Sequence, residues 1–214
     1  MGGFPTFPVS VGGKAAVVAP VTLSSAFRLA LRRPGAGVDL AVSGPGSGDL
    51  FSALAEASKR GAPLVVFPEA CRTNGEGVVD FAPGLFESLS ELKEPPRVHI
   101  IAFQWTRARA FNPQAPLRDM LGLAGMFKSV CQVRYVEAGL LTPLPIKTAK
   151  PKPGSRCRTI GDWSAFAQEV MAASVNKPAL KGLDASDAYE FAAFYSCDDK
   201  VKAGEMAAKR SFRR

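Results

Sequence analysis

A short apolar run that leads directly into charged residues and a glycine-rich turn constrains this chain most. The run Pro63–Val66 is typical of a buried strand. Glu69 and Arg72 follow it, and the turn contains Gly75 and Gly77. Charged side chains are costly to place at the end of a buried strand without a function. Because α/β sheets bind ligands beyond the carboxyl ends of their strands, we expect the functional site in this loop.

Strand-like and helix-like segments alternate along the chain. We expect strands at 15–18, 38–42, 63–66, 98–105 and 132–141, and helices at 21–33, 49–60, 83–93, 117–129, 162–174 and 186–195. This alternation favours an α/β fold in which a mostly parallel sheet is covered by helices on both faces. A chain of 214 residues is long enough to form one sizeable domain.

Changes in composition divide the chain into five segments. We expect a poorly ordered N-terminus at 1–13, rich in Gly and Pro, and an α/β domain at 14–141. A basic, proline-rich linker at 142–158, C-terminal helices at 159–197 and a basic tail at 198–214 complete the chain.

The net charge of +8 is concentrated in the linker and the tail. Such basic patches favour anionic partners, including an anionic membrane surface and the phosphates of coenzyme A. Aromatic residues are not interleaved with the basic ones, which argues against nucleic-acid binding. No apolar run reaches about 18 residues, so we expect no membrane-spanning helix.

The cysteines are scattered and do not form a Cys-x-x-Cys pair, and the chain has one histidine. We therefore expect no metal site and interpret the cysteines as reduced thiols. They are Cys71, Cys131, Cys157 and Cys197. Arg72 would lower the pKa of a neighbouring Cys71 thiol, but no histidine is near in sequence to act as its base. We do not expect a catalytic cysteine.

The turn at 44–48 is similar to a phosphate-binding loop because it is rich in glycine and precedes a helix. The dinucleotide pattern Gly-x-Gly-x-x-Gly would end at Asp49, whose charge repels phosphate. We expect instead that Ser47 or Asp49 caps the helix.

The block from Phe67 to Phe86 resembles the third signature block of the glycerolipid acyltransferases of the lysophosphatidic acid acyltransferase type. In that family a strand runs into Phe-Pro-Glu-Gly-Thr-Arg-Ser, a glycine-rich turn and Phe-x-x-Gly-x-Phe. This chain matches the block at Phe67, Pro68, Glu69, Arg72, Gly75, Gly77, Phe81, Gly84 and Phe86. It departs from the block at Ala70, Cys71 and Thr73, where the family has Gly, Thr and Ser.

The resemblance implies transfer of an acyl group from acyl-coenzyme A, as co-substrate and without a further cofactor, to a lysophospholipid. It implies that Arg72 binds the acceptor phosphate, which suits a bidentate guanidinium. Glu69 would bind the acceptor or order the site, and Thr73, Asn74 and the backbone near Gly75 would add hydrogen-bond donors. The resemblance also implies a location at a membrane, that of the endoplasmic reticulum.

The family's His-x4-Asp block, whose histidine is the proposed general base, has no counterpart here. Gln104 stands five residues after His99, and His99 lies in a strand-like run, so we expect it to be a core or strand-end residue. The arginine of the family's second block is also missing near 38–44. We therefore assign no catalytic residue. We expect either a truncated acyltransferase that lacks an N-terminal portion or a member that has lost its chemistry.

Two alternatives remain open. The first is a non-enzymatic lipid-binding protein built on the same fold, which the missing blocks favour. The second is a nitrilase-type amidase, because Leu64–Glu69 is similar to that family's glutamate strand. That family needs a Glu, a Lys and a Cys, but Cys131 lacks the surrounding pattern and no lysine stands in a matching context. Arg72, Gly77 and the Phe81-x-x-Gly84-x-Phe86 spacing favour the acyltransferase.

Overall fold

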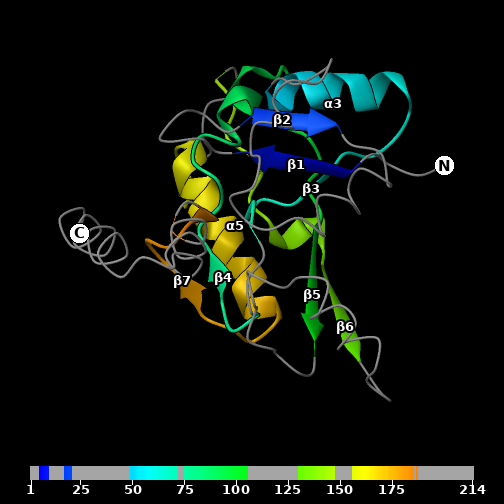
Figure 1. Ribbon diagram of the computed structural model, residues 1–214. Coiled ribbons are helices and arrows are strands. Elements are labelled where there is room, and N and C mark those ends of the chain that lie inside the picture. The colour runs from blue at the N-terminus through cyan, green and yellow to red at the C-terminus, as the bar shows by residue number, and fades with distance from the viewer. Residues whose placement is uncertain are drawn as a thin grey trace, which may run out of the picture.

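A computed structural model describes residues 5–9, 17–20, 49–71, 75–105, 130–147, 156–185 and 187, with the backbone alone at 5–9, 17–20 and 105. Helices and strands are mixed within these ranges, as expected for an α/β protein (Figure 1). The strands are β1 (Pro5–Val9), β2 (Val17–Pro20), β3 (Val65–Val66), β4 (Val78–Val79), β5 (Ile100–Trp105), β6 (Cys131–Val136) and β7 (Ala179–Leu180). The helices are α3 (Leu50–Lys59), α5 (Ile160–Ser174) and the short 3₁₀ helices η1 (Glu87–Glu91) and η2 (Ala138–Leu140).

The described strands form three small sheets. Strand β1 lies between β2 and β3, antiparallel to β2 and parallel to β3. Strand β4 is parallel to β7, and β5 is antiparallel to β6. The mostly parallel sheet with helices on both faces stays a prediction, because these residues show two parallel and two antiparallel pairings.

The poorly ordered N-terminus at 1–13 stays a prediction; within it, β1 pairs with β2 and β3. Two other expected segments differ from the structure. The expected helix at 83–93 is reduced to η1, because Gly84 has a φ of +70° that interrupts a right-handed helix before it starts. The expected strand at 132–141 ends at Val136, where η2 follows shortly.

Several expected segments lie outside the described residues. They are the helices at 21–33 and 117–129, the strand at 38–42, the turn at 44–48, most of the helix at 186–195, part of the linker and the whole basic tail.

Two helices begin at side-chain caps that the sequence signals. The carboxylate of Asp49 accepts a hydrogen bond from the Ser52 N–H at 2.8 Å, which confirms it as the cap of α3. That hydrogen bond lowers the pKa of Asp49. At α5, Thr159 and Asp162 form a reciprocal capping box, in which each side chain accepts from the other's backbone N–H.

One hydrophobic core joins the described segments. It includes Leu50 from α3, Val78 from β4, Ile100 from β5, Val136 from β6 and Trp163 from α5, all less than a tenth exposed. Helix α5 contacts the strands of both two-stranded sheets (Figure 1). The helix therefore links the β4–β7 pair to the β5–β6 pair.

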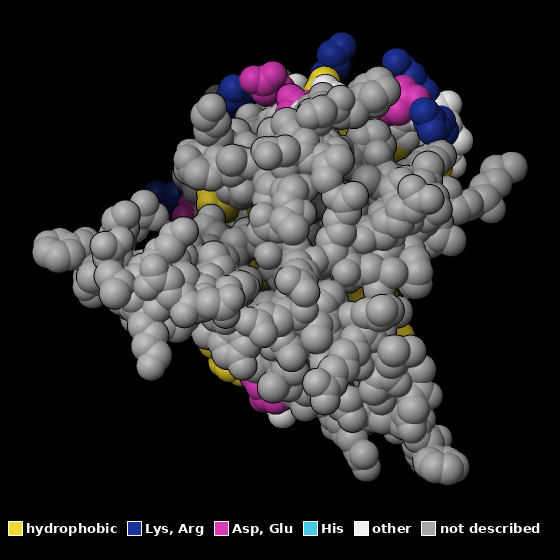
Figure 2. All heavy atoms as spheres, viewed as in Figure 1, with side chains coloured by type: hydrophobic (Ala, Val, Ile, Leu, Met, Phe, Trp, Pro, Cys, Tyr) yellow, Lys and Arg dark blue, Asp and Glu magenta, His cyan; other side chains and the backbone are white. Residues whose placement is uncertain are grey.

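Charged side chains of both signs lie together along the edge of the molecule near α3 (Figure 2). One pair there is Arg60 and Glu56, whose side chains are about half exposed and 2.6 Å apart. Exposed pairs of this kind add little to stability. In the part of the chain that the structure describes, no helix is long and apolar enough to cross a membrane.

Candidate functional site

The loop predicted to be functional leaves β3 and returns to its own starting point. The N–H of Ala82 donates to the carbonyl of Pro68 at 2.8 Å, which closes the base of the loop. The N–H of Ala70 donates to the carbonyl of Phe67 at 3.3 Å, which makes the first turn. Of the predicted site residues, Glu69 and Gly75 are described, whereas Arg72, Thr73 and Asn74 lie outside the described residues.

Glu69 joins the start of the loop to strand β4. Its Oε1 atom accepts a hydrogen bond from the N–H of Val79 at 3.2 Å. Burial raises the pKa of the Glu69 carboxyl, and the hydrogen bond from Val79 offsets part of that rise. The Glu69 carboxylate therefore accepts the hydrogen bond from the β4 backbone that the carbonyl of a neighbouring strand would otherwise accept.

Cys71 lies beside this carboxylate and is not activated as a nucleophile. Burial raises the pKa of the Cys71 thiol to about 12, and the negative charges of Glu69 and Asp184 add to the effect. The thiol is therefore protonated at neutral pH, whereas a nucleophilic cysteine needs its thiolate. This agrees with the expectation that Cys71 is not catalytic.

Asp184 is a neighbour of the site that the sequence does not single out. It acts on the Cys71 thiol although more than a hundred residues separate them in sequence. Asp184 and Asp187 exchange backbone-to-carboxylate hydrogen bonds of 3.0 and 3.3 Å, the pattern of a helix start. Local sequence could reveal that cap, but not its position next to the loop.

Ala70 has a left-handed backbone, with a φ of +54°. This conformation costs a residue with a Cβ atom about 1 to 2 kcal/mol, and it costs glycine almost nothing. The structure thus places an alanine at a position whose backbone conformation favours glycine.

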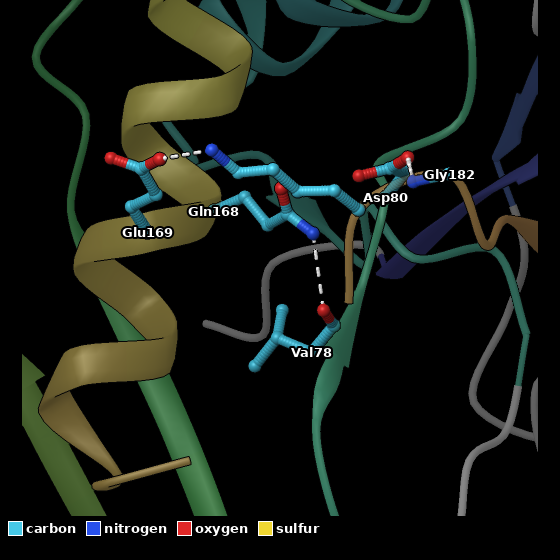
Figure 3. A network of polar contacts seen from close by, with 6 residues as sticks. Val78, Asp80, Gln168, Glu169 and Gly182 are labelled. Carbon is cyan, nitrogen blue, oxygen red and sulfur yellow. Dashed lines mark hydrogen bonds and ion pairs between the residues drawn. The ribbon is translucent and has the colours of Figure 1, made fainter. Parts of the chain in front are cut away.

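Strand β4 is held from the other side by the C-terminal segment. The N–H of Val78 donates to the carbonyl of Pro178 at 3.0 Å, and Gln168 Nε2 donates to the Val78 carbonyl at 3.1 Å (Figure 3). Farther along, the Gly182 N–H donates to Asp80 Oδ2 at 2.6 Å (Figure 3). Residues about a hundred positions away in sequence therefore hold the returning arm of the loop.

Gly77 makes this close approach possible. A Cβ atom there would lie 2.6 Å from Cγ of Leu180 and 3.0 Å from the carbonyl oxygen of Pro178. Both distances are shorter than van der Waals contact. The glycine of the turn is therefore required by packing against β7.

His99 is a strand-end residue, as expected, and its contacts lie away from the loop. It directly precedes β5, its side chain is exposed, and its Nδ1 is 2.7 Å from the Tyr135 hydroxyl on β6. The two rings stack with their centres 5.9 Å apart. This arrangement gives His99 a structural partner on the neighbouring strand.

Cys131, the cysteine considered for an amidase, opens β6 opposite Trp105 of β5. It is not among the groups that shift the pKa of Glu69 or Cys71. Within the described ranges, no group of three His, Cys, Asp or Glu side chains could hold a metal ion.

Comparison of the chain with protein-family models, with curated proteins and with solved structures finds no match. The functional interpretation therefore depends on the residues and geometry of this chain.

Proposed function

We propose that this chain is a glycerolipid acyltransferase domain that uses acyl-coenzyme A and a lysophospholipid of the lysophosphatidic acid type. The observation that supports this proposal most is the anchoring of the loop. Glu69 is bound to Val79, and Pro68 is bound to Ala82, so both arms of the loop are fixed at its base. We propose that the small sheets belong to a mostly parallel sheet covered by helices on both faces.

In this proposal the loop recognises the acceptor phosphate. Arg72 stands three residues after the anchored Glu69, and its guanidinium would bind two phosphate oxygens at once. Thr73, Asn74 and the backbone N–H groups near Gly75 would add further donors. Glu69 would hold the loop in the binding conformation through its hydrogen bond with the Val79 N–H.

The implied reaction joins the acceptor hydroxyl to the acyl carbon. The hydroxyl oxygen attacks the thioester carbonyl, the carbon–sulfur bond breaks, and the coenzyme A thiolate leaves. A general base must take the hydroxyl proton, and no residue of this sequence is assigned to that role. Positioning of the acceptor alone can supply part of a rate enhancement.

A membrane location accompanies the proposal, at the endoplasmic reticulum. The net charge of +8 suits an anionic membrane surface and the phosphates of acyl-coenzyme A. Among the basic residues of the linker that the structure describes, Lys147, Arg156 and Arg158 are exposed and so accessible to such a partner.

A second candidate is a lipid-binding protein of the same fold that carries out no chemistry. The contacts of His99 favour this candidate, because the one histidine of the chain is bound to Tyr135 on β6. The same loop would then bind a lysophospholipid without transferring an acyl group.

The first experiment measures acyl transfer from radiolabelled oleoyl-coenzyme A to lysophosphatidic acid, with lysophosphatidic acid binding measured in parallel. The variant is Arg72→Ala. The matched control is Arg134→Ala, which removes an exposed arginine on β6 and leaves the loop intact.

Three outcomes separate the candidates. Transfer that is lost in Arg72→Ala and kept in Arg134→Ala supports the acyltransferase. Binding that needs Arg72, with no transfer by any form of the protein, supports the lipid-binding protein. Neither transfer nor Arg72-dependent binding contradicts the assignment of the loop.

A further inference from the structure

A single peptide group, between Val78 and Val79, is hydrogen-bonded at both ends by side chains from distant segments. Its carbonyl accepts from Nε2 of Gln168 on α5 at 3.1 Å (Figure 3). Its N–H donates to Oε1 of Glu69, in the loop after β3, at 3.2 Å. The amide of Gln168 and the carboxylate of Glu69 are thus joined through one planar unit of β4.

The peptide group can carry an effect from one side chain to the other. Resonance couples the carbonyl and the N–H of a peptide, so donation to the oxygen makes the N–H a stronger donor. Such chains of hydrogen bonds gain strength in a protein interior, where the dielectric constant is low. Gln168 is 3% exposed, so water does not compete for its amide.

The surroundings keep this chain of hydrogen bonds in place. On the β7 side, the N–H of Val78 donates to Pro178, and the N–H of Asp80 donates to the carbonyl of Leu183 at 2.8 Å. These two hydrogen bonds hold β4 against the segment around β7.

We propose that Gln168 is a positioning residue of the acceptor site, which orients and supports the Glu69 carboxylate through the Val78–Val79 peptide group. The inference depends on the proposed function, because Glu69 in turn holds the loop that carries Arg72. Gln168 would not touch the lysophospholipid itself. Its role would be to keep the Glu69 carboxyl, which anchors the loop, ionised and hydrogen-bonded to the Val79 N–H.

The titratable groups around strand β4 come from several elements. Cys71 lies in the same loop, and Asp184, after β7, acts on the Cys71 thiol. Asp80, directly after β4, accepts from the Gly182 N–H, and Glu169 of α5 binds Lys181 at 2.8 Å (Figure 3). The hydrogen bond from Val79 is the influence that favours the charged form of Glu69, against burial.

The test replaces Gln168 by methionine, which has similar length and no N–H donor. The matched control is Glu169→Gln, one residue along α5, which changes an exposed ion pair and no contact of β4. The full chain is titrated with lysophosphatidic acid in mixed detergent micelles from pH 4 to pH 8, a range that brackets the ordinary carboxyl pKa. The carboxyl resonance of Glu69 is followed by carbon NMR over the same range.

We expect Gln168→Met to weaken binding about three- to tenfold at pH 7, as the loss of one hydrogen bond predicts. We also expect the Glu69 pKa to rise. The loss of lysophosphatidic acid binding that occurs as the pH falls should therefore begin at a higher pH. Titration of the lipid phosphate is common to all variants and cancels in the comparison. The Glu169→Gln control should match the wild type.

If Gln168 had a purely structural role, its replacement would lower the stability of the fold without changing the Glu69 pKa or the pH at which binding is lost. That result would overturn the inference. If Gln168→Met does not fold, Gln168→Asn keeps the amide and shortens its reach, with the same expectations. Binding that depends on Arg72 but not on Gln168 contradicts this inference alone. If binding is independent of Arg72, the proposed function fails, and the NMR titration still tests the link from Gln168 to Glu69.

Discussion

The two described two-stranded sheets are stabilised in different ways. Strands β4 and β7 are two residues long, yet Val78 and Val79 are 7% and 8% exposed. Strands β5 and β6 are six residues long and pair along their whole length, yet Phe103 and Val133, which face each other, are 59% and 58% exposed. The longer pair combines its own backbone ladder with one buried face that includes Ile100 and Val136, whereas the backbone of the shorter pair depends on hydrogen bonds to distant side chains.

This difference shows where a binding loop can be anchored. Within the described residues, the hydrogen bonds that lead out of the β4 backbone end on Glu69, on α5 and on the segment around β7. The β5–β6 pair instead presents an exposed apolar face that also includes Ile101 and Tyr135. The position of the candidate site therefore depends on tertiary packing, and changes should have larger effects around β4 than on that face.

The largest effect is expected from Trp163→Ala. Trp163 is 1% exposed, its ring is 5.3 Å from that of Phe86 at the end of the loop block, and its Nε1 donates to the Thr142 carbonyl. We expect a loss of about 4 kcal/mol in the free energy of unfolding, measured by urea denaturation. Leu140→Ala, at a side chain that is 70% exposed, should change it by less than about 0.5 kcal/mol. Equal losses in both variants would contradict the comparison.

A second change tests the close approach of β4 to β7. Gly77→Ala introduces a Cβ atom that overlaps Leu180 and the backbone of Pro178, so we expect a loss of about 2 kcal/mol. The same urea titration measures it. Gly139→Ala is the control, because a Cβ atom there meets no atom within 4 Å. A neutral Gly77→Ala variant would mean that the two strands do not pack as described.

The pH dependence of stability tests the buried carboxylate. Because burial raises the folded-state pKa of Glu69, the folded protein binds its proton more tightly than the unfolded chain. Stability should therefore decrease as the pH rises from 4.5, the ordinary pKa of a glutamate, through that raised pKa. Glu69→Gln, which cannot ionise and still offers an oxygen to Val79, should remove this decrease. If the free energy of unfolding changes with pH in the same way in the wild type and in Glu69→Gln, the Glu69 carboxyl does not cause the decrease.

Ala70→Gly is expected to stabilise the fold. Glycine removes the left-handed strain at a φ of +54°, and its larger unfolded-state entropy offsets part of the gain, leaving about 0.5 kcal/mol. Asn176 has the same φ of +54°, but asparagine tolerates this region, so Asn176→Gly should give a smaller gain. Thermal unfolding of the two variants measures both gains in stability. A larger gain in Asn176→Gly than in Ala70→Gly would contradict the prediction.

The smallest effect is expected on the β5–β6 face. Phe103→Ser should change the free energy of unfolding by less than about 0.5 kcal/mol, because the side chain remains mostly in water and contributes mainly a cross-strand contact to Val133. Ile100→Ser, on the buried face of the same strand, should cost about 2 kcal/mol or more. If Phe103→Ser is as damaging as Ile100→Ser, then this face is covered in the native protein.

Local signals in the sequence correctly predicted the elements that are long or capped. The expected segments 49–60, 98–105 and 162–174 correspond to α3, β5 and α5, since apolar periodicity and the Asp49 cap act within a few residues. The two-residue strands β4 and β7 are too short to show an alternating apolar pattern in the sequence. Gly84 interrupts the expected helix at 83–93 through a φ that no apolar pattern reveals.

The order of residues alone shows that Glu69 and Arg72 follow a strand and precede a glycine-rich turn. The groups around β4 and Cys71 depend on tertiary packing, because Gln168, Gly182 and Asp184 reach this region from about a hundred residues away. Chain order does not specify such contacts. They form when burial of a shared core brings α5 and β7 against β4, and buried backbone groups must then find partners among the side chains already there.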